Sequence, residues 1–148
     1  MSWPWTASFA LAGALLLLSS LPARAGCEAG FEAFGSSDYD RAFRHLLPCA
    51  EAGDPIVQFN LGLMYDLGDG VPQDGAEAAR WYRRAAQQGD APAQYNLGLM
   101  YANGEGVHQD DVEAVRWFRM AAEQGDTKAQ NKSWFHVWKG SWCRAGPC

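Results

Sequence analysis

The feature that most constrains the fold of this 148-residue chain is an internal repeat. Residues 54–89 align without a gap to residues 90–125, and 22 of the 36 positions are identical. The letters QFNLGLMY, which begin at Gln58, return as QYNLGLMY, which begin at Gln94. A repeat with a period of roughly 20 to 50 residues is typical of solenoids, in which each unit stacks on the next. The repeat therefore predicts a stack of similar units.

Each unit carries the signals of two helices joined by a turn. Asp54 is placed to cap a first helix, and Pro55 suits its first turn because proline lacks the N–H that would be unpaired there. The letters GDG at 68–70 end that helix, since glycine tolerates the left-handed conformation. Asp74 and Glu77 then form an Asp-x-x-Glu capping pair that opens a second helix. The predicted fold is all-α: a short α-solenoid of antiparallel helix-turn-helix repeats.

These motifs resemble those of one known family. The letters AQYNLGLMYANGEGVHQD at 93–110 and EAVRWFRMAAEQGD at 113–126 are similar to the Sel-one-like repeat (SLR), a relative of the tetratricopeptide repeat. The resemblance covers both full units and extends more loosely to 36–54, so a divergent first helical pair is expected at 26–53. The resemblance implies a stack whose concave face binds proteins or peptides, and it implies that bacterial members are often exported.

The first 25 residues are predicted to be a secretory signal peptide. An apolar run at 7–18 precedes the small-x-small site Ala23-Arg24-Ala25, which predicts cleavage after Ala25. The run is shorter than the roughly 20 apolar residues of a membrane span, so no membrane insertion is expected after signal removal. A lipoprotein acylated at Cys27 is the alternative. We expect a periplasmic or secreted protein.

Export would bring the cysteines into an oxidising compartment, where they are candidates for disulfides. Cys27 and Cys49 flank the first helical pair and are the preferred bridge. By resemblance, some exported family members carry one disulfide per unit, whereas the two full units here contain no cysteine. The mature chain would hold 11 basic and 17 acidic residues and shows no basic stretch. Nucleic acid is therefore not an expected partner.

The third copy of the repeat breaks off after Gln130. Asp126, Ala129 and Gln130 keep the period, and then the letters NKSWFHVWKGSWCRAGPC follow with three of the seven tryptophans. A shift of one base in the reading frame turns every tryptophan codon into a glycine codon, and the repeat needs glycines in this region. We therefore interpret 126–148 as a broken third unit with a frameshifted, non-native tail. A natural divergent tail is the alternative.

The candidate binding residues lie on the first helix of each unit: Asn60 and Asn96, together with Met64 and Met100. A side-chain amide offers donors and an acceptor, so on a helix that faces a groove it can clamp a peptide backbone. Asparagines do this in the related tetratricopeptide domains. The alternative is that each asparagine bonds a neighbouring helix and holds the stack together.

The sequence contains no recognisable catalytic constellation. It lacks Ser-x-x-Lys, Gly-x-Ser-x-Gly and His-Glu-x-x-His motifs, and its three histidines lack metal-ligand spacing. We expect a non-enzymatic exported scaffold that binds a protein or peptide through its concave face, with no cofactor and no metal. Two alternatives stay open. One is an envelope enzyme or binder acting on β-lactams or peptidoglycan fragments, which the resemblance also allows, and the other is a pure assembly module.

Overall fold

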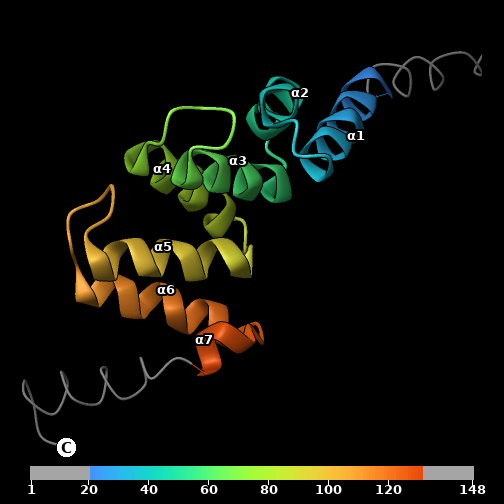
Figure 1. Ribbon diagram of the computed structural model, residues 1–148. Coiled ribbons are helices and arrows are strands. Elements are labelled where there is room, and N and C mark those ends of the chain that lie inside the picture. Colours follow the sequence, from blue (N-terminus) through green and yellow to red (C-terminus); the bar gives the residue numbers. More distant parts are fainter. Residues whose placement is uncertain (1–20, 132–148) are drawn as a thin grey trace, which may run out of the picture.

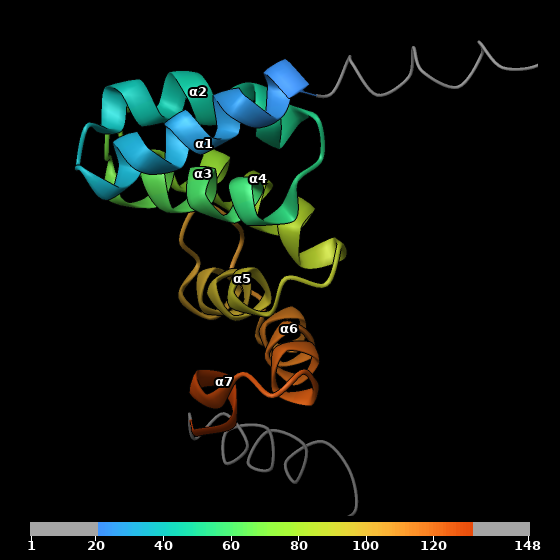
Figure 2. The ribbon, with the colours of Figure 1, turned by 90° about the vertical axis from the view of Figure 1, so that its right-hand side faces the viewer.

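A computed structural model describes residues 21–131 of the chain (Figure 1). Within this range the chain forms seven helices and no strands, which confirms the predicted all-α solenoid. Successive helices pair into the hairpins α1–α2, α3–α4 and α5–α6, each hairpin packs on the next, and α7 packs on α6 (Figures 1 and 2). The helices are α1 (Leu21–Gly35), α2 (Tyr39–Glu51), α3 (Pro55–Leu67), α4 (Gly75–Gln87), α5 (Ala91–Asn103), α6 (Asp111–Glu123) and α7 (Thr127–Asn131).

The helices begin and end at the residues that the sequence predicts. Asp54 accepts a hydrogen bond from the backbone N–H of Ile56 at 2.9 Å, and Asp74 accepts one from Ala76 at 2.9 Å. These bonds satisfy N–H groups that have no partner within the helix. Gly68 ends α3 with a left-handed φ of 79°, which costs glycine little. The same capping role of aspartate recurs at Asp38, Asp90, Asp110 and Asp126.

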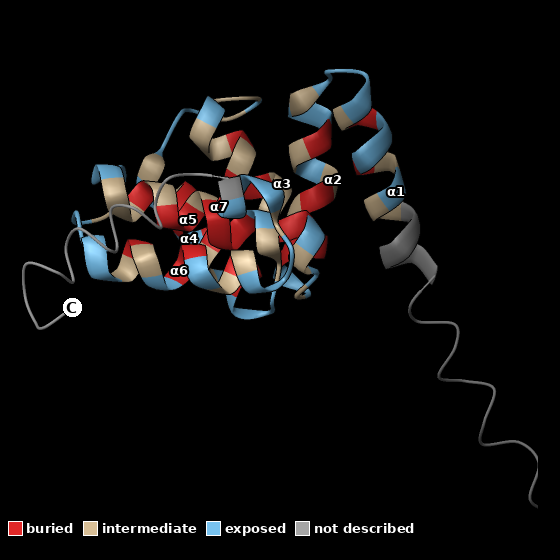
Figure 3. Cartoon of the chain, turned by 90° about the horizontal axis from the view of Figure 1, so that it is seen from below, coloured by how far each residue is buried: buried red, intermediate tan, exposed pale blue. Residues whose placement is uncertain are grey.

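Within each full hairpin, an aromatic ring lies directly on a glycine of the facing helix. The Tyr82 ring of α4 covers Gly62 of α3, and a Cβ at Gly62 would come within 2.5 Å of that ring. The Phe118 ring of α6 covers Gly98 of α5 in the same way, at 2.8 Å. No real Cβ sits so close to another atom, so only glycine lets these helices approach. Buried residues line the facing sides of the helices (Figure 3).

Glutamines connect each unit to the one before it. Gln58 of α3 donates to the carbonyl of Ala50 in α2 at 2.9 Å, and Gln94 of α5 donates to Ala86 in α4 at 3.0 Å. Both side chains are buried, at 4% and 1% exposure, so their amides need these partners. Gln88, at the end of α4, in turn donates to the side-chain oxygen of Gln58 at 2.8 Å. The repeated glutamines therefore bridge neighbouring units.

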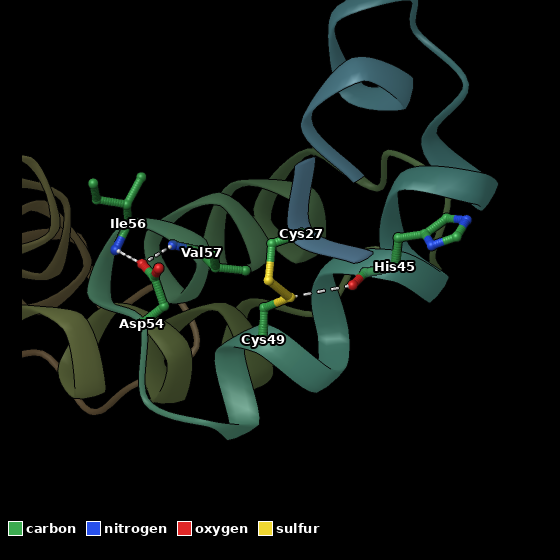
Figure 4. The surroundings of a disulfide bond; sticks show 6 residues. All are labelled: Cys27, His45, Cys49, Asp54, Ile56 and Val57. Carbon is green, nitrogen blue, oxygen red and sulfur yellow. Dashed lines mark hydrogen bonds between the residues drawn. A yellow bond between two sulfur atoms is a disulfide. The ribbon is translucent and has the colours of Figure 1, made fainter. Parts of the chain in front are cut away.

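The first hairpin contains the predicted disulfide. Cys27 of α1 and Cys49 of α2 are bonded, with their Cα atoms 6.0 Å apart (Figure 4). The bond links two helices that already pack together, because Gly30 of α1 lies against Leu46 of α2. A crosslink that closes a loop of this kind restricts the unfolded chain and thereby stabilises the folded one.

Two of the predicted segments lie mostly outside the described residues. These are residues 1–20 of the predicted signal peptide and the tail from residue 132 onward. Helix α1 begins at Leu21, so the predicted cleavage after Ala25 falls inside this helix. Helix α7 keeps the repeat, since Gln130 donates to the carbonyl of Ala122 at 3.1 Å, and Gln94 and Gln58 make the equivalent bonds one and two units earlier. The signal peptide and the frameshift stay predictions.

Candidate functional site

One side of the first helices combines amide and apolar side chains that are open to solvent. Neighbours spaced four, three and four residues apart share one side of a helix, and the first and last of the α3 set, Ile56 and Leu67, are 59% and 64% exposed. We call this surface the first-helix face. It consists of Ile56, Asn60, Leu63 and Leu67 on α3 and of the equivalent Pro92, Asn96, Leu99 and Asn103 on α5, all of them exposed or half-buried.

The two predicted asparagines lie on this face, but they bond differently. The amide of Asn60 donates to the carbonyl of Ile56, one turn earlier in the same helix, at 2.8 Å. The amide of Asn96 acts instead on the hydroxyl of Tyr82, in the preceding unit, and lowers the pKa of that hydroxyl. The difference follows from the sequence of the earlier hairpin, where the position equivalent to Tyr82 is Leu46, which has no hydroxyl. Asn96 therefore lies beside a side chain of the preceding unit, whereas Asn60 bonds its own helix.

Tyr82 carries the connection on to α3. Its hydroxyl donates to Oδ2 of Asp66 at 3.4 Å, so Tyr82 joins α4 to α3 and lies beside Asn96 of α5. Burial raises the pKa of Tyr82, and the negative charge of Asp66 raises it further. The hydroxyl thus keeps its proton at physiological pH and stays a donor to the carboxylate. This bond ties the Asp66 side chain to α4 at the end of the first-helix face.

Asp66 and Glu105 bring negative charge to this end of the face. The pKa of Asp66 is raised by burial, lowered by the bond from Tyr82 and raised again by the charge of Glu105. Glu105 follows α5 and accepts a hydrogen bond from the amide of Asn103 at 3.3 Å. In the part of the chain that the structure describes, the three ion pairs use other carboxylates, those of Glu77, Glu113 and Glu123. Asp66 and Glu105 are therefore not neutralised by a basic side chain of residues 21–131.

Met64 and Met100, which were predicted to be binding residues, do not belong to the first-helix face. Their exposures are 0% and 3%, and each packs in a core cluster between hairpins. Thioethers fill irregular spaces between helices well. Both methionines stabilise the stack and offer no side-chain surface to a partner in this structure.

Residues 21–131 show no arrangement suited to metal binding or membrane insertion. No group of three or more His, Cys, Asp or Glu side chains that could hold a metal ion comes together among them. None of the helices in this range is both long and apolar enough to span a bilayer. The chemistry available on the first-helix face is therefore amide hydrogen bonding, apolar contact and carboxylate charge.

The repeats can now be compared with known proteins. The Sel1 repeat matches residues 24–54, 55–90 and 91–126, which together make up more than half of the chain. The chain belongs to the Sel1 repeat family. The matched segments lie within two residues of the predicted units, and they make the divergent first pair a repeat in its own right. Proteins of this family are repeat scaffolds that typically mediate protein–protein interaction.

Two bacterial Sel1-type structures resemble this one. A Sel1 repeat protein from Oxalobacter formigenes is 39% identical with a TM-score of 0.71, over 77% of this chain and 47% of that protein. A protective antigen of uropathogenic Escherichia coli strains that displays an SLR fold is 41% identical with a TM-score of 0.74, over 80% of this chain and 26% of the antigen. This chain therefore spans less than half the length of either protein.

Two further similarities are weaker. The cysteine-rich protein B of Helicobacter pylori shares the fold, with a TM-score of 0.59 at 21% identity, over 76% of this chain and 95% of that protein. A chitin synthase regulator of Saccharomyces cerevisiae is 38% identical over 60 residues, which is 40% of this chain and 8% of the regulator. The bacterial relatives and the disulfide together indicate a protein that works outside the cytoplasm.

The bond between Tyr82 and Asp66 was not predicted from the sequence. A signal for it was present, because the two units differ at both relevant positions together. The first unit pairs Asp66 with Tyr82, whereas the second pairs Ala102 with Phe118. A hydroxyl that appears with a carboxylate in one unit, and is lost with it in the next, indicates that the two groups interact.

Proposed function

We propose that this protein is an exported, non-enzymatic scaffold that binds a protein or peptide through the first-helix face. The observation that carries the proposal is the combination of exposed apolar residues, Ile56 and Leu67, with amides at the repeated positions Asn60 and Asn96. Apolar side chains provide contact area, and amides offer both donors and acceptors to a peptide backbone. The general role of Sel1 repeats in protein interaction supports it.

The alternative of an enzyme or binder acting on β-lactams gains no support from residues 21–131. His45 and His108 lie in separate units, and His108 is an exposed loop residue whose ring nitrogen contacts the carbonyl of Gln109. A nucleophile paired with a base within hydrogen-bond reach, as acyl transfer requires, is not found in this range. Nitrocefin turnover by the purified protein would reverse this assignment.

A site-specific crosslinking experiment tests the proposed binding face. A photo-reactive phenylalanine analogue at Leu67, on the face, is compared with one at Val112, which is 78% exposed on the second helix α6. We expect crosslinks to a discrete protein or peptide from position 67 in cells that export the chain, and none from position 112. Equal crosslinking from both positions would show non-specific contact and would contradict the proposal.

Replacing both asparagines separates recognition from stability. The double substitution Asn60→Ala and Asn96→Ala should abolish crosslinking from position 67 if the amides clamp the partner. The melting temperature should then stay nearly unchanged for Asn60→Ala alone, because Asn60 bonds only its own helix. If crosslinking persists and only the melting temperature falls, the asparagines stabilise the stack, and the proposal that their amides bind the partner is wrong.

The export part of the proposal has its own test. Cleavage after Ala25 would leave Gly26 as the first residue and would shorten α1 by its first five residues. N-terminal sequencing of protein recovered from the periplasm or the medium should therefore begin at Gly26. Lipid attached to Cys27 would contradict cleavage after Ala25. The absence of the disulfide in exported protein would contradict the pairing of Cys27 with Cys49.

A further inference from the structure

One side of α6 is covered less completely than the same side of α4. Ala79 and Ala86 of α4 pack in a core cluster with residues of α5, and they are only 1% and 0% exposed. The equivalent residues of α6, 36 positions later, are Val115 and Ala122, and both are half-buried. Among the described helices, only the five-residue α7 follows α6 and packs on it (Figures 1 and 2). This side of α6 is therefore partly open to solvent.

Helix α7 lies where the first helix of another unit would begin. Asp126 accepts a hydrogen bond from the N–H of Ala129 at 2.8 Å, as Asp90 does from Ala93 at 2.7 Å. Ala129 is buried, like Ala93. The bond that Gln130 donates to α6 also repeats a bond between α5 and α4. These contacts show that the junction between α4 and α5 starts again at α6 and α7.

Gln130 makes only half of the hydrogen bonds that its counterparts make. The side-chain oxygen of Gln58 accepts from the amide of Gln88, 30 residues later. That of Gln94 accepts from Gln124, at the same spacing. The oxygen of Gln130 accepts no hydrogen bond within residues 21–131, and its side chain is exposed, whereas the other two acceptors are buried. Gln88 and Gln124 directly follow second helices, so the equivalent donor for Gln130 would follow a second helix after α7.

The loop of each full unit also packs on the hairpin before it. Gly70 lies against the backbone of Tyr39 in the first turn of α2, and Gly106 lies in the same way against Gly75 in the first turn of α4. The equivalent residue of α6 is Asp111, which is exposed, whereas Tyr39 and Gly75 are half-buried. The first turn of α6 is therefore a second place that the loop of a following unit would cover.

The first hairpin of a second copy does not fit this side of α6. Two residues after the shared glycine, α3 and α5 carry the buried side chains of Met64 and Met100, whereas α1 carries the exposed Glu32. Stacking α1 on α6 would bury this carboxylate, and burial of an unpaired charge is costly. Only residues 36–38 separate α1 from α2, so this hairpin also lacks the glycine loop of the full units.

We infer that this side of α6 and α7, which we call the stacking surface, binds a further helical hairpin of the full-unit type that continues from α7. The stacking surface consists of Asp111, Val115, Ala122 and Gln130. A hairpin that fits it has apolar residues like Leu97 and Met100 on its first helix, a glycine in its loop and a glutamine 30 residues after Gln130. Burial of apolar side chains between neighbouring units stabilises a stack of this kind.

The stacking surface shares no residue with the first-helix face, so its role does not depend on the proposed binding of a peptide or protein. A hairpin after α7 is also what the interpretation of 126–148 as a broken third unit requires. That interpretation rests on codons, whereas the burial and the hydrogen bonds around α6 and α7 are independent of the reading frame.

A chimera that completes the unit tests this inference. In it, residues 95–125 follow Gln130 in place of residues 131–148, so that a full hairpin continues from α7 in register. Relative to the unmodified chain, we expect hydrogen exchange of the α6 backbone amides to slow by about tenfold, because neighbouring units protect each other, and exchange in α1 and α2 to change little. A control chimera of the same length carries Leu97→Gln and Met100→Gln in the added copy alone, and it should leave exchange in α6 unchanged.

Three outcomes would contradict the inference. Equal protection of α6 by both chimeras would show that added length, and not the fit of the hairpin, is responsible. Unchanged exchange in both chimeras would show that the stacking surface does not bind such a hairpin. Sedimentation of the unmodified chain should show a monomer, and a dimer in which α6 is protected would show that a second copy covers the surface instead.

Discussion

The first hairpin and the two later hairpins share one arrangement of helices, but different contacts hold their two helices together. Glycines mark equivalent positions on the first helices, because Gly30, Gly62 and Gly98 each lie against a side chain of the paired helix. Three residues before these glycines stand Cys27, Phe59 and Tyr95. The two aromatic rings pack against the rings of the paired helix, Phe59 on Tyr82 and Tyr95 on Phe118, with centroids 5.8 and 5.6 Å apart.

In the first hairpin this ring contact is replaced by a covalent bond. Its paired helix carries Leu46 where the later hairpins have Tyr82 and Phe118, and three residues further on Cys49 stands where they have Ala85 and Ala121. The disulfide therefore occupies the place of the ring pair. The two helices of such a hairpin can thus be held together either by a disulfide or by the packing of two rings.

Breaking the disulfide should lower the free energy of unfolding more than any of the other changes described below. For Cys27→Ser with Cys49→Ser we expect the free energy of unfolding of the first hairpin to fall by about 3 kcal/mol, the entropic value for a loop of this size. Hydrogen exchange should report faster opening in α1 and α2 and little change in α5 and α6. Uniform loss of protection along the whole stack would show that the hairpins unfold as one unit. It would contradict the prediction that the disulfide stabilises the first hairpin alone.

The next effect is expected from the glycines under the rings. Gly62→Ala places a Cβ within 2.5 Å of the Tyr82 ring, and overpacking of this kind costs up to about 3 kcal/mol. Alanine regains about 1 kcal/mol of helix propensity, so a net loss of about 2 kcal/mol is expected in chemical denaturation. Gly35→Ala is the matched control, because nothing lies within 4 Å of that position. The prediction is wrong if both substitutions have the same effect.

A smaller effect should come from the glutamines between units. Gln94→Ala removes a buried amide that donates to Ala86 and accepts from Gln124, so we expect a loss of about 1.5 kcal/mol. Gln130→Ala removes the equivalent bond to Ala122 at an exposed position, where water replaces the lost partner, and should cost well under half as much. Thermal melting of the two variants measures the difference, and equal losses would contradict the role of burial.

The smallest effect is expected from the hydroxyl that distinguishes the two ring pairs. Tyr82→Phe makes the second hairpin like the third and removes the bond to Asp66, at a cost of about 1 kcal/mol. The reverse change, Phe118→Tyr, puts a hydroxyl opposite Ala102 and therefore gains no carboxylate partner. We expect denaturant titration to show no stabilisation by Phe118→Tyr. A gain in stability would show that the carboxylate is unimportant.

Much of the fold could be predicted from the sequence because its signals are local. The helix starts follow from aspartates whose side chains reach N–H groups two or three residues later, as at Asp54 and Asp74. The helix ends follow from glycines that adopt a left-handed φ, as at Gly68 and Gly104. The repeat then requires that equivalent hairpins stack in equivalent ways. The disulfide could be predicted because Cys27 and Cys49 flank one hairpin.

The candidate site depended more on tertiary structure. Asn60 and Asn96 are each followed by the same five residues in their own helices. Their surroundings differ because the preceding hairpin has Leu46 near Asn60 and Tyr82 near Asn96. Met64 and Met100 were predicted to bind a partner, but they are buried because their side of the helix meets the preceding hairpin.

The sequence by itself thus determined the units, their caps and their order, since each depends on contacts within a few residues. Only the tertiary structure decided which side of each first helix stays open and which side chains are shared between units. Those outcomes depend on groups about 30 residues apart, such as Gln88 and Gln58, or on a residue of the preceding unit, such as Tyr82 for Asn96. The stacking of hairpins brings these groups together.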